Sequence, residues 1–214
     1  MNTVIVNYKS YDPATGENAL KLTKLLEENA EGVNLMVVAS DIDVYKIATS
    51  TKVKVLAQHV DNVEFGRGTG KTLAKAVKEN KAKGVLLNHS EDKMELKDIK
   101  GCIEKCKALK LITVVCCAKL SEAKQIIEFK PDYLAYEVPE LIGTGNSISK
   151  TSPGLIQRFV KIVGKDAIPL CGAGITVNED YKAAIKLGTK GVLVASGITK
   201  ADRPGRAMKD LIKE

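Results

Sequence analysis

The chain has 214 residues, of which 44% are hydrophobic and 28% are charged. This composition excludes a disordered chain and supplies enough apolar residues for one sizeable core. The length leaves little room for two full-sized domains, so we expect a single domain over residues 1–214. The longest mostly apolar run, residues 111–118, is far shorter than the ~18 residues typical of a membrane-spanning helix. Because no signal-peptide pattern opens the chain, we expect a soluble cytoplasmic protein.

The net charge of +7 gives little indication of nucleic-acid binding. The lysines are spread among glutamates, and the sequence has no Trp and only 4% aromatic residues. Nucleic-acid-binding proteins usually show a clustered basic stripe with stacking aromatic residues. The charge therefore indicates a lysine-rich surface, with a mild attraction for anionic ligands. The five cysteines lie in apolar segments, and their odd number favours reduced, buried thiols.

Short runs rich in Val, Ile and Leu predict eight β-strands. They cover residues 3–6, 35–39, 53–57, 84–88, 111–116, 133–136, 167–171 and 191–195. Continuous apolar runs suit strands that are covered on both faces, as in a parallel sheet flanked by helices. Eight strand–helix pairs fit a compact (β/α)8 barrel, for which ~200 residues is the lower limit. Periodicity alone leaves an open doubly wound sheet as the alternative.

Helical spacing of apolar residues supports this alternation. Three segments carry such stripes: Leu22, Leu25, Leu26 and Ala30; Ile99, Cys102, Ile103 and Cys106; and Ile156, Phe159, Val160 and Val163. The third segment also has a start signal, with Ser152 as N-cap and Pro153 at the first helical position. We therefore expect helices at all three places.

Polar and glycine residues follow the predicted strands, where parallel α/β proteins carry their active sites. In chain order these are Asn7 and Lys9, Gln58 and His59, Asn88 to Glu91, Glu137, Gly172 to Gly174, and Ala195 to Gly197. A glutamate facing a histidine and a lysine suits proton abstraction beside a carbonyl. Small residues in turns let backbone N–H groups approach a phosphate. No metal-ligand spacing is present, so we expect neither metal nor cofactor.

Three of these segments resemble the signatures of the triosephosphate isomerase family. They are Asn7-Tyr8-Lys9, Asn88-His89-Ser90-Glu91, and the run Tyr-Glu-Val-Pro-Glu-Leu-Ile-Gly-Thr-Gly at residues 136–145. The match continues in order through residues 57–59, 171–175 and 191–197 and has the form of the short archaeal members. The resemblance implies a TIM barrel and the cofactor-free interconversion of dihydroxyacetone phosphate and glyceraldehyde 3-phosphate in glycolysis and gluconeogenesis.

The resemblance also implies residue roles. Glu137 would be the base that moves the proton, and His89 the neutral electrophile, its proton affinity lowered by a helix that begins just after it. Lys9 would stabilise the anionic substrate. A second set would support these groups or contact the substrate: Asn7, Ser90, Glu91 and Cys116. Within that set Glu91 would pair with Lys9, and Cys116 would be structural.

Phosphate binding is implied for two turns and a lid. The turns are Gly172-Ala173 and Ala195-Ser196, and the lid is residues 138–145, in which Ile142 and Gly143 would contact the substrate. The Gly-Ala-Gly at 172–174 lacks the serine hydroxyl of the long family forms. Val138 and Glu140 stand where those forms carry proline and tryptophan, which puts the rigidity of the first lid hinge in question.

The glycine-rich string at residues 66–72 is similar to a phosphate-binding P-loop but is one residue short, because Phe65 stands where the motif needs glycine. The family resemblance makes it instead the third barrel loop, whose Thr69 would reach into a neighbouring subunit of a dimer or tetramer. His59 is interpreted as structural or interfacial. Two alternatives remain: another phosphate-binding barrel isomerase acting on a sugar phosphate, and a non-enzymatic nucleotide- or RNA-binding module using residues 66–72.

Overall fold

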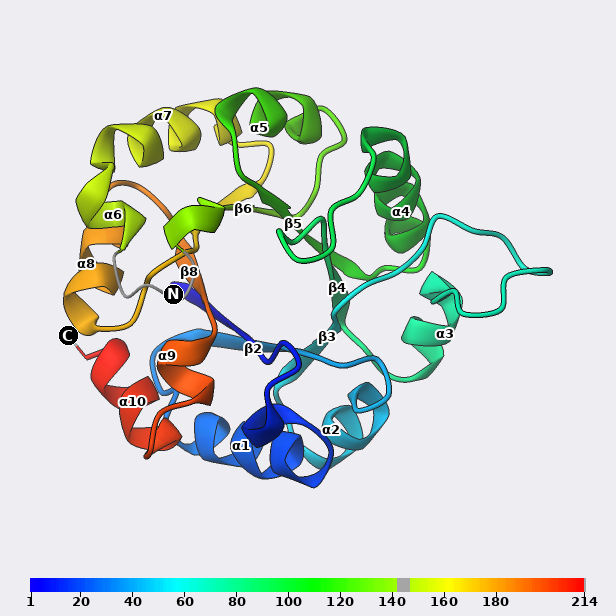
Figure 1. Ribbon diagram of the computed structural model, residues 1–214, viewed down its shortest axis with the longest axis horizontal. Coiled ribbons are helices and arrows are strands. Elements are labelled where there is room, and N and C mark those ends of the chain that lie inside the picture. Colours follow the sequence, from blue (N-terminus) through cyan, green and yellow to red (C-terminus); the bar gives the residue numbers. More distant parts are fainter. Residues whose placement is uncertain (142–146, 214) are drawn as a thin grey trace.

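The computed structural model describes residues 1–141 and 147–213. Eight parallel strands close into a barrel in which each strand pairs with the next and β8 returns to β1 (Figure 1). The strands are β1 (Thr3–Asn7), β2 (Asn34–Ala39), β3 (Lys54–Ala57), β4 (Gly84–Leu87), β5 (Ile112–Cys117), β6 (Tyr133–Tyr136), β7 (Ile168–Cys171) and β8 (Gly191–Val194). Each lies within one residue of its expected bounds, so the compact (β/α)8 barrel is confirmed and the open sheet is excluded.

Helices surround the barrel (Figure 1). They are α1 (Glu17–Glu28), α2 (Val44–Ser50), α3 (Ala74–Glu79), α4 (Leu96–Ala108), α5 (Leu120–Ile127), α6 (Ile148–Thr151), α7 (Pro153–Val163), α8 (Asn178–Lys186), α9 (Ser196–Thr199) and α10 (Pro204–Leu211), with 3-10 turns η1 (Asp12–Ala14) and η2 (Pro139–Leu141). Within the described residues, none of the helices is both long and apolar enough to cross a membrane.

The strands bury both of their faces. Along β1, Ile5 points into the barrel interior with Met36 and Leu86, whereas Val4 and Val6 belong to the cluster between the strands and the helices. Successive side chains of a strand point to opposite faces. Because both faces are covered here, neither set of positions needs to be polar, which explains the continuous apolar runs.

The helix predictions hold for two stripes and fail in part for the third. All four stripe residues of α4 are fully buried, and α7 begins at Pro153 with Ser152 as N-cap, although the Ser152 side chain makes no capping hydrogen bond. In α1, however, Leu25 is 44% exposed and Ala30 lies beyond the helix end. The buried face of α1 consists of Ala19, Leu22, Thr23 and Leu26, and Leu25 falls roughly 110° from the mean direction of these four at 100° per residue.

Candidate active site

One pocket at the carboxyl ends of the strands brings together the predicted catalytic side chains. Lys9 follows β1, His89 follows β4 and Glu137 follows β6, and all three line this pocket. Its remaining wall includes the turns after β7 and β8, at residues 173–176 and 195–197. These residues are far apart in sequence and meet only because the strands close into a barrel.

Lys9 is held in an unfavourable backbone conformation. Its φ of 48° lies in the left-handed region, which costs free energy for a residue with a side chain. The Lys9 N–H donates to Asn7 Oδ1 at 3.0 Å, and Gln58 Nε2 donates to the Lys9 carbonyl at 2.8 Å. The ammonium pairs with Glu91 Oε1 at 2.7 Å, as expected. These bonds direct the Lys9 side chain toward the pocket, and the role of Gln58 in this was not predicted.

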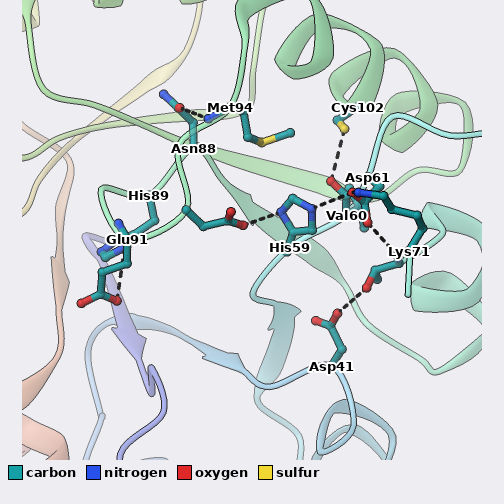
Figure 2. Close-up of polar contacts among 12 residues, drawn as sticks. Asp41, His59, Val60, Asp61, Lys71, Asn88, His89, Glu91, Met94 and Cys102 are labelled. Carbon is teal, nitrogen blue, oxygen red and sulfur yellow. Dashed lines mark hydrogen bonds and ion pairs between the residues drawn. The ribbon is translucent and has the colours of Figure 1, made fainter. Parts of the chain in front are cut away.

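A hydrogen bond from the backbone orients the His89 ring. The backbone N–H of Glu91 donates to His89 Nδ1 at 3.2 Å (Figure 2). Nδ1 accepts this bond, and Nε2 faces Glu137 Oε2 at 3.6 Å. The expectation of a helix beginning just after His89 is wrong, since α4 begins only at Leu96. A turn follows instead, and its Glu91 N–H group is the one that donates to the ring.

Asn88 holds the strand end that carries His89. Its φ of 56° is also left-handed. The Asn88 amide donates to the Cys116 carbonyl and to Glu122 Oε1, both at 2.8 Å, and its oxygen accepts from the Met94 N–H at 3.0 Å (Figure 2). The side chain thus joins the ends of β4 and β5 and the start of α4.

Glu122 is a positioning residue that sequence reasoning did not identify. Besides Asn88, it binds the backbone N–H of Ala118 at 2.8 Å and the ammonium of Lys93 at 2.6 Å. Burial alone would raise the pKa of Glu122, but the hydrogen bonds from Lys93, Ala118 and Asn88 outweigh it and hold that pKa below its usual value. Glu122 is therefore a charged carboxylate at neutral pH. Its position in α5 gave no sequence signal, because a helical glutamate is usually on the surface.

Glu137 presents a buried and unpartnered carboxylate oxygen. Oε2 has no hydrogen-bond partner among the described residues and lies 3.6 Å from His89 Nε2. The side chain lies over Gly172, where an added Cβ would fall 2.5 Å from Glu137 Cγ. The Cys116 thiol is also buried nearby, and burial together with the charge of Glu137 raises its pKa well above the usual value. Cys116 is thus a neutral packing partner of the Glu137 side chain.

The turns after β7 and β8 present backbone donors to the pocket. The N–H groups of Ala173, Gly174, Ser196 and Gly197 make no hydrogen bond within the described parts of the chain. Ala173 adopts a left-handed φ of 63°. Converging N–H groups of this kind bind anions. Gly172 differs, because its own N–H donates to the Tyr136 carbonyl at 3.0 Å, and its contribution is the space for Glu137.

The remaining predicted residues lie in several places. Ile142 and Gly143 fall outside the described residues, as does the second half of the predicted lid, residues 142–145. Ser90 is half-buried in the turn after His89, and Thr69 is exposed on the loop between β3 and α3. Tyr11 lines the pocket and was not predicted. Within residues 1–141 and 147–213, no three metal-ligating side chains lie together.

Comparisons with known proteins agree with this geometry. The sequence model of the triosephosphate isomerase family matches residues 2–214. Triosephosphate isomerases of Methanocaldococcus jannaschii, Methanobacterium bryantii and Archaeoglobus fulgidus are 43%, 45% and 40% identical to it. Each alignment covers 98–99% of this chain and 96–98% of the relative. The comparisons do not support the sugar-phosphate or nucleic-acid alternatives. The chain belongs to the triosephosphate isomerase family.

Proposed function

We propose that this protein interconverts dihydroxyacetone phosphate and D-glyceraldehyde 3-phosphate. The observation that carries the proposal is the pairing of two groups. An unpartnered Glu137 oxygen, which can accept a proton, lies 3.6 Å from His89 Nε2, which can donate one. A carbon acid bound in the pocket against both groups would lose its proton to the carboxylate while its oxygen is stabilised by the imidazole.

The reaction moves only protons. Glu137 takes a proton from C1 of dihydroxyacetone phosphate, and the electron pair of that C–H bond forms the C1=C2 bond of an enediolate. The His89 Nε2–H and the Lys9 ammonium stabilise the charge on the oxygens, and the hydroxyl proton passes from O1 to O2. The Glu137 carboxylic acid then returns its proton to C2, which gives the aldehyde at C1. No redox cofactor takes part in this sequence.

The substrate phosphate would bind at the far wall of the pocket. Ala173, Gly174, Ser196 and Gly197 supply uncommitted N–H groups there. A phosphate held at this wall would place the reacting carbons beside Glu137 and His89. The net charge of +7 favours a dianionic substrate modestly.

The direct test follows wild-type protein by NMR in D2O with dihydroxyacetone phosphate. Because a carboxylic acid proton exchanges with solvent, we expect glyceraldehyde 3-phosphate that carries deuterium at C2. Ribose 5-phosphate serves as the second arm, and we expect no turnover of it. Conversion of the pentose but not the triose would favour another phosphate-binding barrel isomerase. Triose conversion in which no deuterium is ever incorporated would contradict the proton-transfer mechanism.

We also propose that the protein is a homo-oligomer in which Thr69 contacts a neighbouring subunit. The loop between β3 and α3 extends away from the barrel (Figure 1), and Phe65 on it is 74% exposed. The two ends of the loop are held together, because the Asp61 carboxylate pairs with the Lys71 ammonium at 2.9 Å (Figure 2). A second pocket beside Lys9, lined also by residues 40–42, is a suitable acceptor for such a loop.

Sedimentation of Thr69→Glu tests the subunit contact. A buried charge at an interface is costly, so we expect a smaller assembly than that of wild type at the same concentration. An assembly of unchanged size would show that Thr69 is an exposed loop residue that does not contact a neighbouring subunit. Whether the wild type is a dimer or a tetramer is read from the same experiment.

A cytoplasmic role in glycolysis and gluconeogenesis follows from the proposed reaction, with residues 1–214 acting as one barrel domain. The five cysteines are free and buried. Such thiols suit a reducing compartment, which supports the proposed location.

A further inference from the structure

A buried carboxylate holds the β7 turn from behind. Asp180 lies in the first turn of α8 and is only 2% exposed. Its Oδ2 accepts hydrogen bonds from the backbone N–H groups of Thr176 and Val177, at 3.1 and 3.3 Å, and from the Thr176 hydroxyl at 3.4 Å. Because Thr176 also lines the catalytic pocket, Asp180 fixes one part of the pocket wall.

The other oxygen of this carboxylate pairs with α6. Lys150 Nζ lies 2.7 Å from Asp180 Oδ1. From the same short helix, the Ile148 N–H donates to the Ala173 carbonyl at 3.5 Å. Helix α6 therefore contacts the turn at both ends, directly at Ala173 and through Asp180 at Thr176.

The two phosphate-binding turns are also packed against each other. A Cβ added to Gly197, in the β8 turn, would lie 3.2 Å from the Cα atom of Thr176. A shift of Thr176 would therefore disturb the N–H groups of Ser196 and Gly197 as well. The contacts that hold Thr176 in place therefore influence the position of the N–H groups in both turns.

A buried negative charge next to an anion site requires compensation. Coulomb interactions are stronger in a partly buried site than in water, so an unpaired Asp180 would repel a bound phosphate. We infer that Asp180 and Lys150 are positioning residues of the phosphate-binding turn. Asp180 anchors the N–H groups at the end of the turn, and Lys150 cancels the charge of that carboxylate. The inference rests on the proposed function in that it takes the pocket to bind a phosphate-bearing substrate.

The test compares Lys150→Met, Asp180→Asn and the double variant with wild type. Inorganic phosphate is the probe, and its binding is measured by calorimetry and as competitive inhibition. We expect Lys150→Met to weaken phosphate binding about tenfold, because it leaves an uncompensated buried charge. The double variant, which removes both charges, should bind phosphate within about threefold of wild type. If Lys150 and Asp180 served only the stability of the fold, the variants would have lower melting temperatures, but the double variant would not regain phosphate affinity.

Lys75→Met is the matched control. The Lys75 side chain is 50% exposed like that of Lys150, and it pairs with Glu79 at 2.6 Å, but Glu79 is itself 63% exposed. We expect wild-type phosphate affinity for this variant, which shows that a change of one unit in net charge is not the cause.

The outcomes separate this inference from the proposed function. The inference would be overturned if folded Lys150→Met bound phosphate with wild-type affinity. It would also be overturned if the double variant bound phosphate no more tightly than Lys150→Met. If Lys150→Met does not fold, a loss of about tenfold or more in the double variant would overturn it, and near-wild-type affinity there would support it. Failure of wild type to isomerise triose phosphate would refute the proposed function, while the binding measurements would still judge the two positioning residues.

Discussion

The two walls of the pocket are built in different ways. One wall, after β1, β4 and β6, presents the side chains of Lys9, His89 and Glu137. The other, after β7 and β8, presents backbone N–H groups of small residues. On the first wall, two strand ends are fixed by polar side chains such as Asn7 and Asn88, and on the second the β7 turn is fixed by a carboxylate of α8 and its lysine partner.

In the proposed function, the first wall carries out the chemistry and the second wall binds the phosphate. The proposed proton transfer requires particular functional groups, so we expect exchange of the first-wall residues to abolish the reaction. Anion binding requires only that N–H groups converge, so several small residues serve in the turns. The geometry of the second wall therefore depends on residues that do not touch the substrate. Substitutions on the two sides should affect kcat and phosphate affinity separately.

Gly172→Ala is expected to have a large effect because Gly172, at the start of the turn after β7, packs against the Glu137 side chain of the other wall. A Cβ there would lie 2.5 Å from Glu137 Cγ and 2.6 Å from its Oε1, so the base must move. A displacement of about 1 Å at a reacting group costs roughly 100-fold, and we expect a loss of that order in kcat with a smaller change in phosphate affinity. Gly154→Ala in α7 is the control, since an added Cβ there meets nothing within 4 Å. A kcat within threefold of wild type would show that Glu137 does not depend on this space.

Glu122→Gln should have an intermediate effect on the first wall alone. The substitution removes the charge that pairs with Lys93 and one of the oxygens that bind Asn88 and Ala118. We expect kcat to fall about tenfold through a shifted His89, with phosphate affinity unchanged. Steady-state kinetics and phosphate inhibition measure the two effects, and Glu79→Gln is the exposed control. An equal loss in both quantities would contradict the division between the walls.

The smallest expected effect concerns acid stability. Burial alone would raise the pKa of Asp180, but the hydrogen bonds from Lys150, Thr176 and Val177 outweigh it and hold that pKa below its usual value. A carboxyl with a lowered pKa stabilises the fold fully above its unfolded value of ~3.9 and loses this contribution as pH falls through the folded value. Asp180→Asn should therefore be less stable than wild type by about 1–3 kcal/mol at neutral pH.

Urea unfolding between pH 7 and pH 3 tests this expectation. The difference in unfolding free energy between wild type and Asp180→Asn should shrink below about pH 4. Asp210→Asn, at an exposed ion pair of α10, is the control for loss of a carboxylate. A difference that stays constant down to pH 3 would mean that Asp180 does not titrate as described.

The first wall was largely predictable from sequence, because its residues follow strands that continuous apolar runs reveal. The second wall was predictable only as small residues in turns. Asp180 and Lys150 gave no signal, since a charged residue in a helix is usually on the surface and their pairing depends on how α6 packs against α8. Glu122 escaped prediction for the same reason. A neutral His89 was expected from a helix beginning just after it, but a turn follows His89, and the Glu91 N–H donates to its Nδ1.

Glu137 is the proposed base of the reaction. The most direct test is kcat for Glu137→Gln in a coupled isomerase assay, with Glu128→Gln as the exposed control. One acid–base group typically contributes 10²–10⁴-fold. We expect a loss of at least that size, because no other carboxylate lines the catalytic pocket within the described residues. A Glu137→Gln enzyme that turns over at close to the wild-type rate would show that Glu137 is not the base.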